Sequence, residues 1–246
     1  MSDIRFVFAE FSSQKARELA IRSDPRTASD DRYVLKSFLN ENFGEHVFRP
    51  WRLMGVGDSF KVVGCLQPGC APDLSSMSAA GGINTAVEGW TVADSGARTE
   101  MEFELSAVKV VRPASSGGRR VYMDVSVRKE TAADGRTRYF AATGDELVHA
   151  YAAWLFNEIL DGDYGFRPAG VPRIVSTSPL RHFRKPNGGG YPKLVLTPRM
   201  LARMKVEVTD PGKLEATIYG GMRRMKDIGL GSVIPCEILE KRKASA

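Results

Sequence analysis

Hydrophobic positions near the start of the chain change from a period of two to a period of three or four. Apolar residues occupy every second position from Ile4 to Phe8, which predicts a β-strand. In segment 30–43 the apolar residues recur at helical spacing, which predicts an amphipathic helix. Ser29 is the expected N-cap of this helix, and Gly44 is placed to end it.

Strands dominate the next part of the chain. Segments 47–55 and 59–66 predict two strands joined by a tight Gly-Asp turn, and 87–92 predicts another. Pro50 indicates that the first of these is an edge strand or carries a bulge. The small-residue segment 68–84 contains a weak, short helix pattern. The resulting order, β-α-β-β-α-β, is that of a ferredoxin-like domain.

A second set of elements begins after a boundary at 95–98. The clearest helix of the chain is predicted over 145–160, where Thr143 and Glu146 form a capping-box pattern. Asp210-Pro211 is expected to open a last helix as N-cap and N1. The remaining apolar runs predict strands at 101–111, 121–127, 173–176, 193–196, 204–208 and 233–239.

The two halves therefore repeat one order of elements. We predict an α+β protein with two tandem ferredoxin-like (RRM-like) domains, residues 1–95 and 96–246. The second domain is expected to carry a basic insertion of helix and loop, with Asn187-Gly-Gly-Gly190 as its mobile part. A chain of 246 residues, 43% of them apolar, is long enough to bury two such cores.

Charge is concentrated in one segment of the second half. The chain carries 35 Lys and Arg against 29 Asp and Glu, a formal net charge of +6. Segment 167–205 alone holds nine basic residues and no acidic one, so the rest of the chain is net negative. A solvated surface usually mixes both signs. We therefore expect this segment to face a polyanion, although a solvated basic face is the alternative.

The cysteines limit the class of protein. Cys65, Cys70 and Cys236 are odd in number and form no CxxC motif, which excludes a disulfide framework and a Cys₄ zinc site. Buried free thiols fit a reducing, cytoplasmic location. The first residues lack the apolar region of a signal peptide, and no apolar run approaches ~18 residues, so no membrane partner is expected.

Five stretches occur together and in order in one known family. One is the glycine-rich segment Gly220-Gly-Met-Arg-Arg-Met-Lys226 and Ile228-Gly-Leu-Gly-Ser-Val233, close after Val206-Glu-Val-Thr-Asp-Pro211. The others are Asp31-Arg-Tyr-Val-Leu-Lys36, Phe48-Arg-Pro-Trp-Arg52, Phe103-Glu-Leu-Ser-Ala-Val108, and Ala153-Trp-Leu155 with Gly165-Phe-Arg167. The chain thereby resembles the CRISPR-associated RAMP endoribonucleases, most of all the CasE branch. Where the sequence departs from the CasE branch, the chain resembles divergent members of the family, such as those of type IV CRISPR systems.

The resemblance implies a function. Members of this family bind the repeat hairpin of precursor CRISPR RNA, cut at its 3′ base and keep the mature guide RNA. The ribose 2′-OH attacks the adjacent phosphate without a metal or other cofactor, leaving a 2′,3′-cyclic phosphate. The sequence has no Asp/His cluster with metal-ligand spacing, which suits such a route. Other CRISPR effector subunits are the further partners that the family implies.

The catalytic residues implied by the resemblance lie on helix 30–43. In the CasE-like helix a Tyr precedes a catalytic His by three residues; here Tyr33 matches the Tyr, and Lys36 stands in place of the His. A Lys with a reference pKa of about 10.4 needs a depression of ~3 units to act as a base near neutral pH. Charge stabilisation or protonation of the leaving oxygen suits Lys36 better. An exposed structural lysine is the alternative.

Further candidate catalytic residues lie near this helix in the sequence, and the candidate RNA-binding residues lie mainly in the second half of the chain. Arg22 and Arg26, expected in a loop, are placed to reach a scissile phosphate, and His46 is able to accept a proton, although a structural histidine is the more usual case. The glycine-rich loop is expected to approach phosphates through its backbone, although an ordinary turn is the alternative. The residues expected to bind RNA are Arg32, Arg119, Arg120, Arg167, Arg181, His182, Arg184, Lys185, Arg223, Arg224, Lys226 and Arg242.

Three functions thus remain in view. The first is the endoribonuclease just described. The second is a non-catalytic RNA-binding RAMP subunit of a CRISPR effector complex, which the replaced histidine favours. The third is an unrelated ferredoxin-like protein of small-molecule metabolism. No Walker A, GxGxxG, GxSxG or zinc motif supports a specific version of the third.

Overall fold

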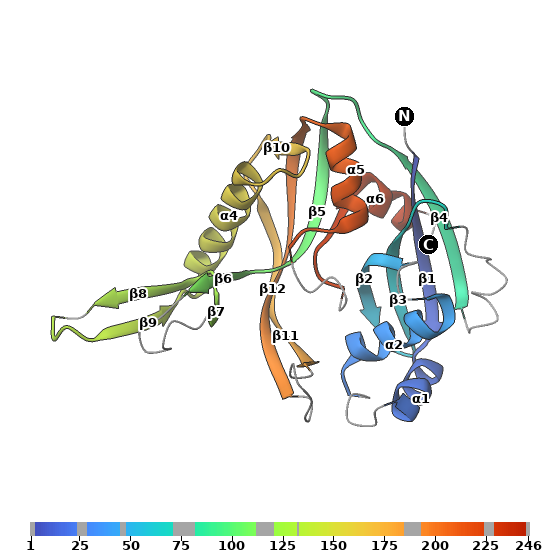
Figure 1. Ribbon diagram of the computed structural model, residues 1–246, viewed down its shortest axis with the longest axis horizontal. Helices are drawn as coiled ribbons and strands as arrows, with labels where there is room; N and C mark the ends of the chain where they lie inside the picture. Colours follow the sequence, from blue (N-terminus) through green and yellow to red (C-terminus); the bar gives the residue numbers. More distant parts are fainter. Residues whose placement is uncertain are drawn as a thin grey trace.

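Two antiparallel sheets form the protein in the computed structural model, which describes residues 3–23, 29–44, 48–70, 82–111, 121–131, 133–184, 193–223 and 229–244 (Figure 1). The first sheet has the order β2-β3-β1-β4, the ferredoxin-like arrangement. Two helices cover one face of it. Its elements are β1 (Asp3–Ser12), α1 (Ser13–Ser23), α2 (Asp31–Phe43), β2 (Phe48–Val56), β3 (Ser59–Leu66) and β4 (Gly82–Thr91).

The second sheet repeats this arrangement with the order β10-β12-β5-β13, and the long strand β12 pairs with β11 as well as with β10. An α+β protein of two ferredoxin-like halves, as predicted, is confirmed. The elements are β5 (Arg98–Ser106), α4 (Gly144–Asp161), β10 (Phe166–Pro168), β11 (Arg173–Arg184), β12 (Lys193–Val208), α5 (Pro211–Gly220), β13 (Ser232–Pro235) and α6 (Cys236–Ala244). The division at residues 95 and 96 stays a prediction.

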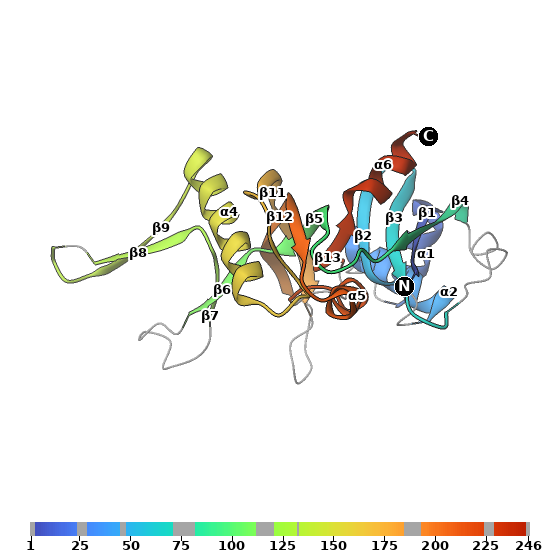
Figure 2. The same cartoon turned by 90° about the horizontal axis from the view of Figure 1, so that it is seen from above.

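Two further hairpins lie between β5 and α4. They are β6 (Val108–Val111) with β7 (Val121–Asp124), and β8 (Val127–Thr131) with β9 (Thr137–Ala141). Each forms a two-stranded sheet of its own. Seen from above, β8 and β9 project away from both main sheets (Figure 2).

Strand β1 contributes to two hydrophobic clusters because its side chains alternate between the faces of the first sheet. Val7 and Phe11 pack with the buried residues of α1 and α2. Ile4, Phe6 and Phe8 pack instead with residues of the second half, including those of β5, α5 and α6. The first sheet is therefore buried on both faces, and the two halves share one continuous apolar core.

Most predicted elements occur where the pattern placed them. β3 has the predicted bounds, and Gly44 and Asp210 cap α2 and α5 as expected. β2, which contains Pro50, is an edge strand with a shifted register, which confirms the interpretation of that proline. Cys65 and Cys236 are buried free thiols. The predicted weak helix over 68–84 and the loop 187–190 lie wholly or mainly outside the described residues.

Other boundaries were wrong for identifiable reasons. The N-cap of α2 is Asp30, whose carboxylate accepts from two backbone N–H groups, and not Ser29. Thr143 makes no capping hydrogen bond through its side chain. Helix α1 was missed because its fully buried positions are two small alanines, Ala16 and Ala20, which give a weak apolar stripe. The run after Pro235 forms α6 rather than a strand, since proline ends β13 there.

The basic segment is also built differently from the prediction. Segments 193–196 and 204–208 belong to the single strand β12, and 173–176 begins the long strand β11. The predicted strand 101–111 is interrupted at Ala107 and divided into β5 and β6. The expected helix-and-loop insertion is therefore, in its described part, the β11–β12 hairpin.

Candidate functional site

Helix α2 carries the two residues that the sequence places at a catalytic centre, and it is anchored at its first turn. Asp30 accepts hydrogen bonds from the backbone N–H groups of Arg32 and Tyr33, at 3.1 Å each. Arg32 donates to Glu104 of β5 and, at 2.9 Å, to the carbonyl oxygen of Gly229. One side chain thus ties α2 to the second sheet and to the glycine-rich segment.

Arg32 belongs to a buried network of six charged side chains. Glu102 and Glu104 lie on one face of β5, and four guanidinium groups surround them. Arg52 pairs with both carboxylates, with its Nε 3.2 Å from a Glu104 oxygen, although these two buried atoms form no hydrogen bond and interact only electrostatically. Arg199 and Arg203 of β12 pair with Glu104 and Glu102, respectively. Arg203 also pairs with the exposed Glu240 of α6 at 3.6 Å, and with this carboxylate included the net charge of the network is +1.

The position of this network follows from strand register. Arg203 lies directly opposite Glu102 in the β5–β12 pairing, so both side chains point to the same face. The alternate residues Met101, Phe103 and Leu105 are buried on the other face. The second sheet therefore turns an apolar face to the core that both halves share and a charged face to Arg32 of α2 and Arg52 of β2.

Burial and pairing act in opposite directions on these groups. Desolvation lowers the pKa of Arg32, and the negative charge of Glu104 opposes that shift. For Glu102, burial alone raises the pKa, but the charges and hydrogen bonds of Arg52 and Arg203 outweigh it and hold the pKa below its usual value. The Glu102 carboxylate is therefore ionised at neutral pH.

Arg32 was predicted to bind RNA, and the structure directs its side chain into the protein. Its side chain is only 5% exposed, and its donors are directed to Glu104 and Gly229. His182 was expected at the RNA surface as well. It is 3% exposed, and its Nε2 lies 2.9 Å from Thr197 Oγ1. Arg32 thus links α2 to β5, and His182 links β11 to β12, while their binding of RNA stays a prediction.

Tyr33 and Lys36 remain together on α2. They are three residues apart, so they neighbour each other on the helix surface, and both are half-buried. Lys36 also follows Arg32 by one helical turn, which places it on the helix face that meets the second half. α2 contacts β11 on that side. The structure therefore brings the predicted catalytic helix and the basic hairpin to one interface.

The other predicted catalytic residues divide into two groups. Arg22 is exposed in the last turn of α1, a helix rather than the expected loop. The other group, Arg26 and His46, lies outside the described residues. Five of the predicted RNA-binding residues also lie outside them: Arg119, Arg120, Lys185, Arg224 and Lys226. Arg184 ends β11, and Arg242 lies half-buried in α6.

Four basic residues of the segment 167–205 are positioned in two different ways. Arg181 is exposed on β11 and is available to a ligand. Arg167 pairs with Glu207, while Arg199 and Arg203 pair with carboxylates of the neighbouring strand β5. A segment without acidic residues in the sequence thus receives acidic partners from outside it.

The described part of the glycine-rich segment is buried from Gly229 to Val233, whereas Gly220 is exposed. Gly229 has φ +76°, and its backbone approaches Trp51 so closely that a Cβ there would lie 2.4 Å from the indole ring. Arg223, expected to bind RNA, donates to Glu158 and to the Val108 carbonyl, and it stacks 4.8 Å from the Trp154 ring centre. The described contacts of Gly229 and Arg223 are internal to the protein, and binding of RNA by this loop stays a prediction.

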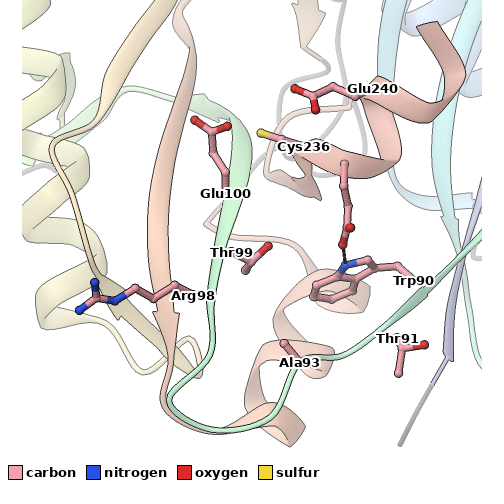
Figure 3. A pocket seen from close by; sticks show the side chains of 9 residues that line it. Trp90, Thr91, Ala93, Arg98, Thr99, Glu100, Cys236 and Glu240 are labelled. Atoms are coloured by element: carbon pink, nitrogen blue, oxygen red, sulfur yellow. Dashed lines mark hydrogen bonds between the residues drawn. The ribbon is translucent and has the colours of Figure 1, made fainter. Parts of the chain in front are cut away.

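A cavity of about 380 Å³ lies elsewhere, between α6 and the connection from β4 to β5 (Figure 3). Glu100, Glu237 and Glu240 line it, and Trp90 donates its indole N–H to Glu237. An acidic lining disfavours phosphate. Within the described residues no group of three His, Cys, Asp or Glu is arranged to hold a metal, and none of their helices is long and apolar enough to cross a membrane.

Sequence reasoning missed the network of Arg52, Glu102, Glu104, Arg199 and Arg203. A signal was present, because Glu alternates with large apolar residues in Met-Glu-Phe-Glu-Leu and a strand with one polar face needs partners for it. The identity of those partners depends on which strand lies opposite. That pairing is set by tertiary structure.

Comparisons with known proteins give a consistent fold. No protein-family model and no curated protein matches the sequence. Among solved structures, the CRISPR endoribonuclease Cse3 bound to 19 nt RNA matches with a TM-score of 0.59 and 20% identity over 94% of this chain and 98% of that one.

Two others agree. Thermus thermophilus Cse3, bound to an RNA representing a pre-cleavage complex, has a TM-score of 0.56 and 19% identity. Cas6e from Escherichia coli str. K-12 has 0.50 and 13%. Both cover 94% of this chain and 98% of their own. The chain therefore has the fold of these proteins over nearly its whole length.

Proposed function

We propose that this protein is a metal-independent endoribonuclease that binds the repeat hairpin of precursor CRISPR RNA, cleaves at its 3′ base and stays bound to the mature guide. The observation that carries the proposal is the fold likeness, over 94% of the chain, to a CRISPR endoribonuclease bound to RNA. The five sequence stretches that resemble this family support it independently, because their order along the chain is that of the same enzymes. The type IV placement is part of the same proposal.

The proposed reaction is an intramolecular transfer at phosphorus. The 2′-oxygen attacks the adjacent phosphorus and loses its proton, and the bond from phosphorus to the 5′-oxygen breaks. The products are a 2′,3′-cyclic phosphate and a 5′-hydroxyl, which gains a proton. The protein must hold the attacking and leaving oxygens in line and supply positive charge to the phosphorane.

Lys36 is the proposed source of charge and of the proton for the leaving oxygen. An ammonium group with a reference pKa of about 10.4 is protonated at neutral pH, so it suits both roles and not that of a base. Tyr33, its neighbour on the helix, offers a hydroxyl to the same phosphate. Arg22 and Arg26 add charge. Of the named candidates, only His46 has a reference pKa near enough to neutrality to accept the 2′-proton.

The β11–β12 hairpin is the proposed site for the RNA stem. A-form RNA hides its base edges in a narrow groove, so phosphate contacts and shape dominate its recognition. Arg181 is exposed on β11, and Arg184 and Lys185 follow it in the sequence. Retention of the guide would bring the protein into a complex with other CRISPR effector subunits.

Cleavage and binding of the repeat test the proposal. The protein is incubated with its neighbouring repeat RNA in EDTA, beside the same RNA with a 2′-deoxy nucleotide at the cut. Cleavage of the first RNA alone, with a 2′,3′-cyclic end, is the expected result. Equal cleavage of both, or no cleavage without added metal, would contradict the mechanism.

A non-catalytic RNA-binding RAMP subunit is the second candidate function, and the lysine in place of a histidine favours it. It predicts tight binding of the hairpin with neither RNA cut. Failure to bind either RNA at low salt would reject both functions.

A further inference from the structure

An inserted arm, residues 107–143, separates β5 from α4. In the first half, by comparison, β1 leads directly into α1. The insertion forms the hairpins β6–β7 and β8–β9, which pair only within themselves. The β8–β9 hairpin extends away from both main sheets in both views (Figures 1 and 2). The arm is therefore a separate element from the β11–β12 hairpin and from α2, the proposed catalytic helix.

The outer hairpin of this arm has no core. Every residue from Arg128 to Ala141 whose side chain the structure describes is exposed. A two-stranded hairpin alone is marginally stable in water, because it buries too little apolar surface to offset the ordering of its backbone. By contrast, β11 pairs with a strand of the five-stranded sheet. An isolated hairpin of this kind becomes more stable when a ligand binds it and buries its exposed side chains.

The two faces of the hairpin differ in their surroundings. Arg128 lies opposite Phe140, and Lys129 lies opposite Tyr139, so each face pairs a cation with an aromatic ring. Arg128 forms an ion pair of 2.9 Å with Glu146 in the first turn of α4. The face of Lys129 and Tyr139 is therefore turned away from α4.

The chemistry of the arm fits a polyanion with exposed rings. Segment 108–141 holds eight Lys and Arg and three Asp and Glu, which is a larger relative excess than that of the whole chain. Tyr139 and Phe140 are each 47% exposed, and Tyr122 is 41% exposed. Aromatic rings beside cations are typical of surfaces that bind single-stranded nucleic acid, where bases stack and phosphates pair. Protein interfaces, in contrast, are depleted in lysine at their cores.

We propose that the arm binds unpaired RNA that flanks the repeat hairpin, by stacking a base on Tyr139 and by pairing phosphates with Lys129, which lie on the same face of the β8–β9 hairpin. The inference rests on the proposed function for the source of the RNA. It concerns a surface distinct from the β11–β12 hairpin. Arg119 and Arg120, predicted to bind RNA from the sequence, belong to the same insertion and lie outside the described residues.

Three RNAs separate the arm from the hairpin site. They are the repeat hairpin alone, the hairpin with an unstructured ten-nucleotide extension on its 5′ or 3′ side, and the extension alone. We expect an extension on one side to tighten binding by the intact protein about tenfold, which is about the gain from one stacked base. A double variant, Lys129→Ala with Tyr139→Ala, is expected to lose this gain and to bind the hairpin alone normally.

A matched control uses exposed residues of β2 and β3 in the first sheet. The double variant Val56→Ala with Lys61→Ala also removes one lysine and one exposed apolar side chain. It is expected to keep the full gain from the extension. Because the arm residues are unburied, the arm variant is expected to melt at the temperature of the intact protein, so loss of binding is not loss of folding.

The remaining outcomes are decisive. If neither extension tightens binding, or if the arm variant keeps the gain, the inference is wrong. If the arm variant loses assembly with effector subunits and keeps the gain, the arm is a protein contact and the inference is also wrong. If the hairpin fails to bind but the extension alone binds through the arm, the proposed function fails and the inference stands. If nothing binds, both fail.

Discussion

Arg32 of α2 and Glu104 of β5 form an ion pair that is buried between the two halves, with side chains 5% and 0% exposed. A second donor of Arg32 reaches the Gly229 carbonyl at 2.9 Å. The pair therefore sets the distance between the helix that carries Tyr33 and Lys36 and the sheet that continues into the β11–β12 hairpin. Removing Arg32 takes one of three cations away from the fully buried Glu104 and the side-chain donor away from the Gly229 carbonyl, which is costly.

Arg32→Met is accordingly expected to destabilise the protein by about 3 kcal/mol and to lower the rate of RNA cleavage more than hairpin affinity. Chemical denaturation and single-turnover kinetics measure the two effects. Arg17→Met is the control, because Arg17 pairs with Asp31 of the same helix but both side chains are about one-third exposed. Its expected cost is under about 1 kcal/mol. Equal effects of the two substitutions would show that burial of the pair has no importance.

Lys36 is tested by two substitutions with different chemistry. Lys36→Ala is expected to slow cleavage by about 10²- to 10⁴-fold at saturating protein, with little change in hairpin affinity. Lys36→Arg is expected to restore part of the rate if the positive charge matters, and none if the proton matters, because arginine does not release a proton near neutral pH. Lys15→Ala, exposed on α1, is the control. A parental rate for Lys36→Ala would remove Lys36 from the mechanism.

Glu102 predicts an acid-dependent loss of stability. Its pKa in the folded protein lies below the ordinary value of 4.5 because Arg52 and Arg203 stabilise the carboxylate. The stabilisation is fully present above about pH 4.5 and is lost as the pH falls through the lower pKa of the folded state. Glu102→Gln should therefore cost about 3 kcal/mol at pH 7 and flatten the decline below pH 4.5.

Urea denaturation at several pH values measures this dependence. Glu41→Gln, at an exposed position of α2, serves as the control and is expected to follow the parent. If Glu102→Gln kept the acid dependence of the parent, other carboxylates would be responsible for it.

The salt dependence of RNA binding tests the hairpin site. Replacing Arg181, Arg184 and Lys185 with Ala is expected to lower the slope of log K against log salt by about one unit for each phosphate that the protein no longer binds. Arg167→Ala is the control, because Arg167 pairs with Glu207 at the other end of the sheet. An unchanged slope in the triple variant, or an equal fall in the control, would place the RNA elsewhere.

The fold could be predicted from the sequence because its long strands and helices have clear periodicity. The order of elements in both halves and the edge position of β2 follow from such local patterns. α1 escaped because alanines fill its buried positions, and α6 escaped because an apolar run continues through Pro235. In both cases the pattern was weak or ambiguous where tertiary packing decided the structure.

The candidate site was less predictable because the charges that neighbour a residue in the sequence differ from those that neighbour it in the folded protein. The segment 167–205 has no acidic residue, yet Arg199 and Arg203 face Glu104 and Glu102 across a strand pair. Arg32 follows Asp31 in a polar first turn, which predicts exposure, and it is buried because β5 offers a carboxylate. Strand pairing and domain packing determine which arginines are available to RNA, and neither is a local property.

Gly229 and Gly135 give a matched test of what the glycine-rich segment does. Both have φ +76°, where an L side chain is disfavoured by about 1–2 kcal/mol. The two positions differ in the room that an added Cβ atom would have. A Cβ at Gly229 would lie 2.4 Å from the Trp51 ring, whereas a Cβ at Gly135 in the β8–β9 turn would meet nothing within 4 Å. Gly229→Ala therefore carries the backbone cost and a further overlap cost of about 1–3 kcal/mol.

We expect Gly229→Ala to lower the free energy of unfolding by clearly more than Gly135→Ala, as measured by denaturant titration. The Gly229 substitution should also reduce cleavage, since moving Trp51 or the Gly229 carbonyl displaces the acceptor of Arg32 and with it the first turn of α2. Gly135→Ala should leave cleavage unchanged. Equal losses of stability would mean that Trp51 shifts freely and that this glycine serves only its backbone conformation.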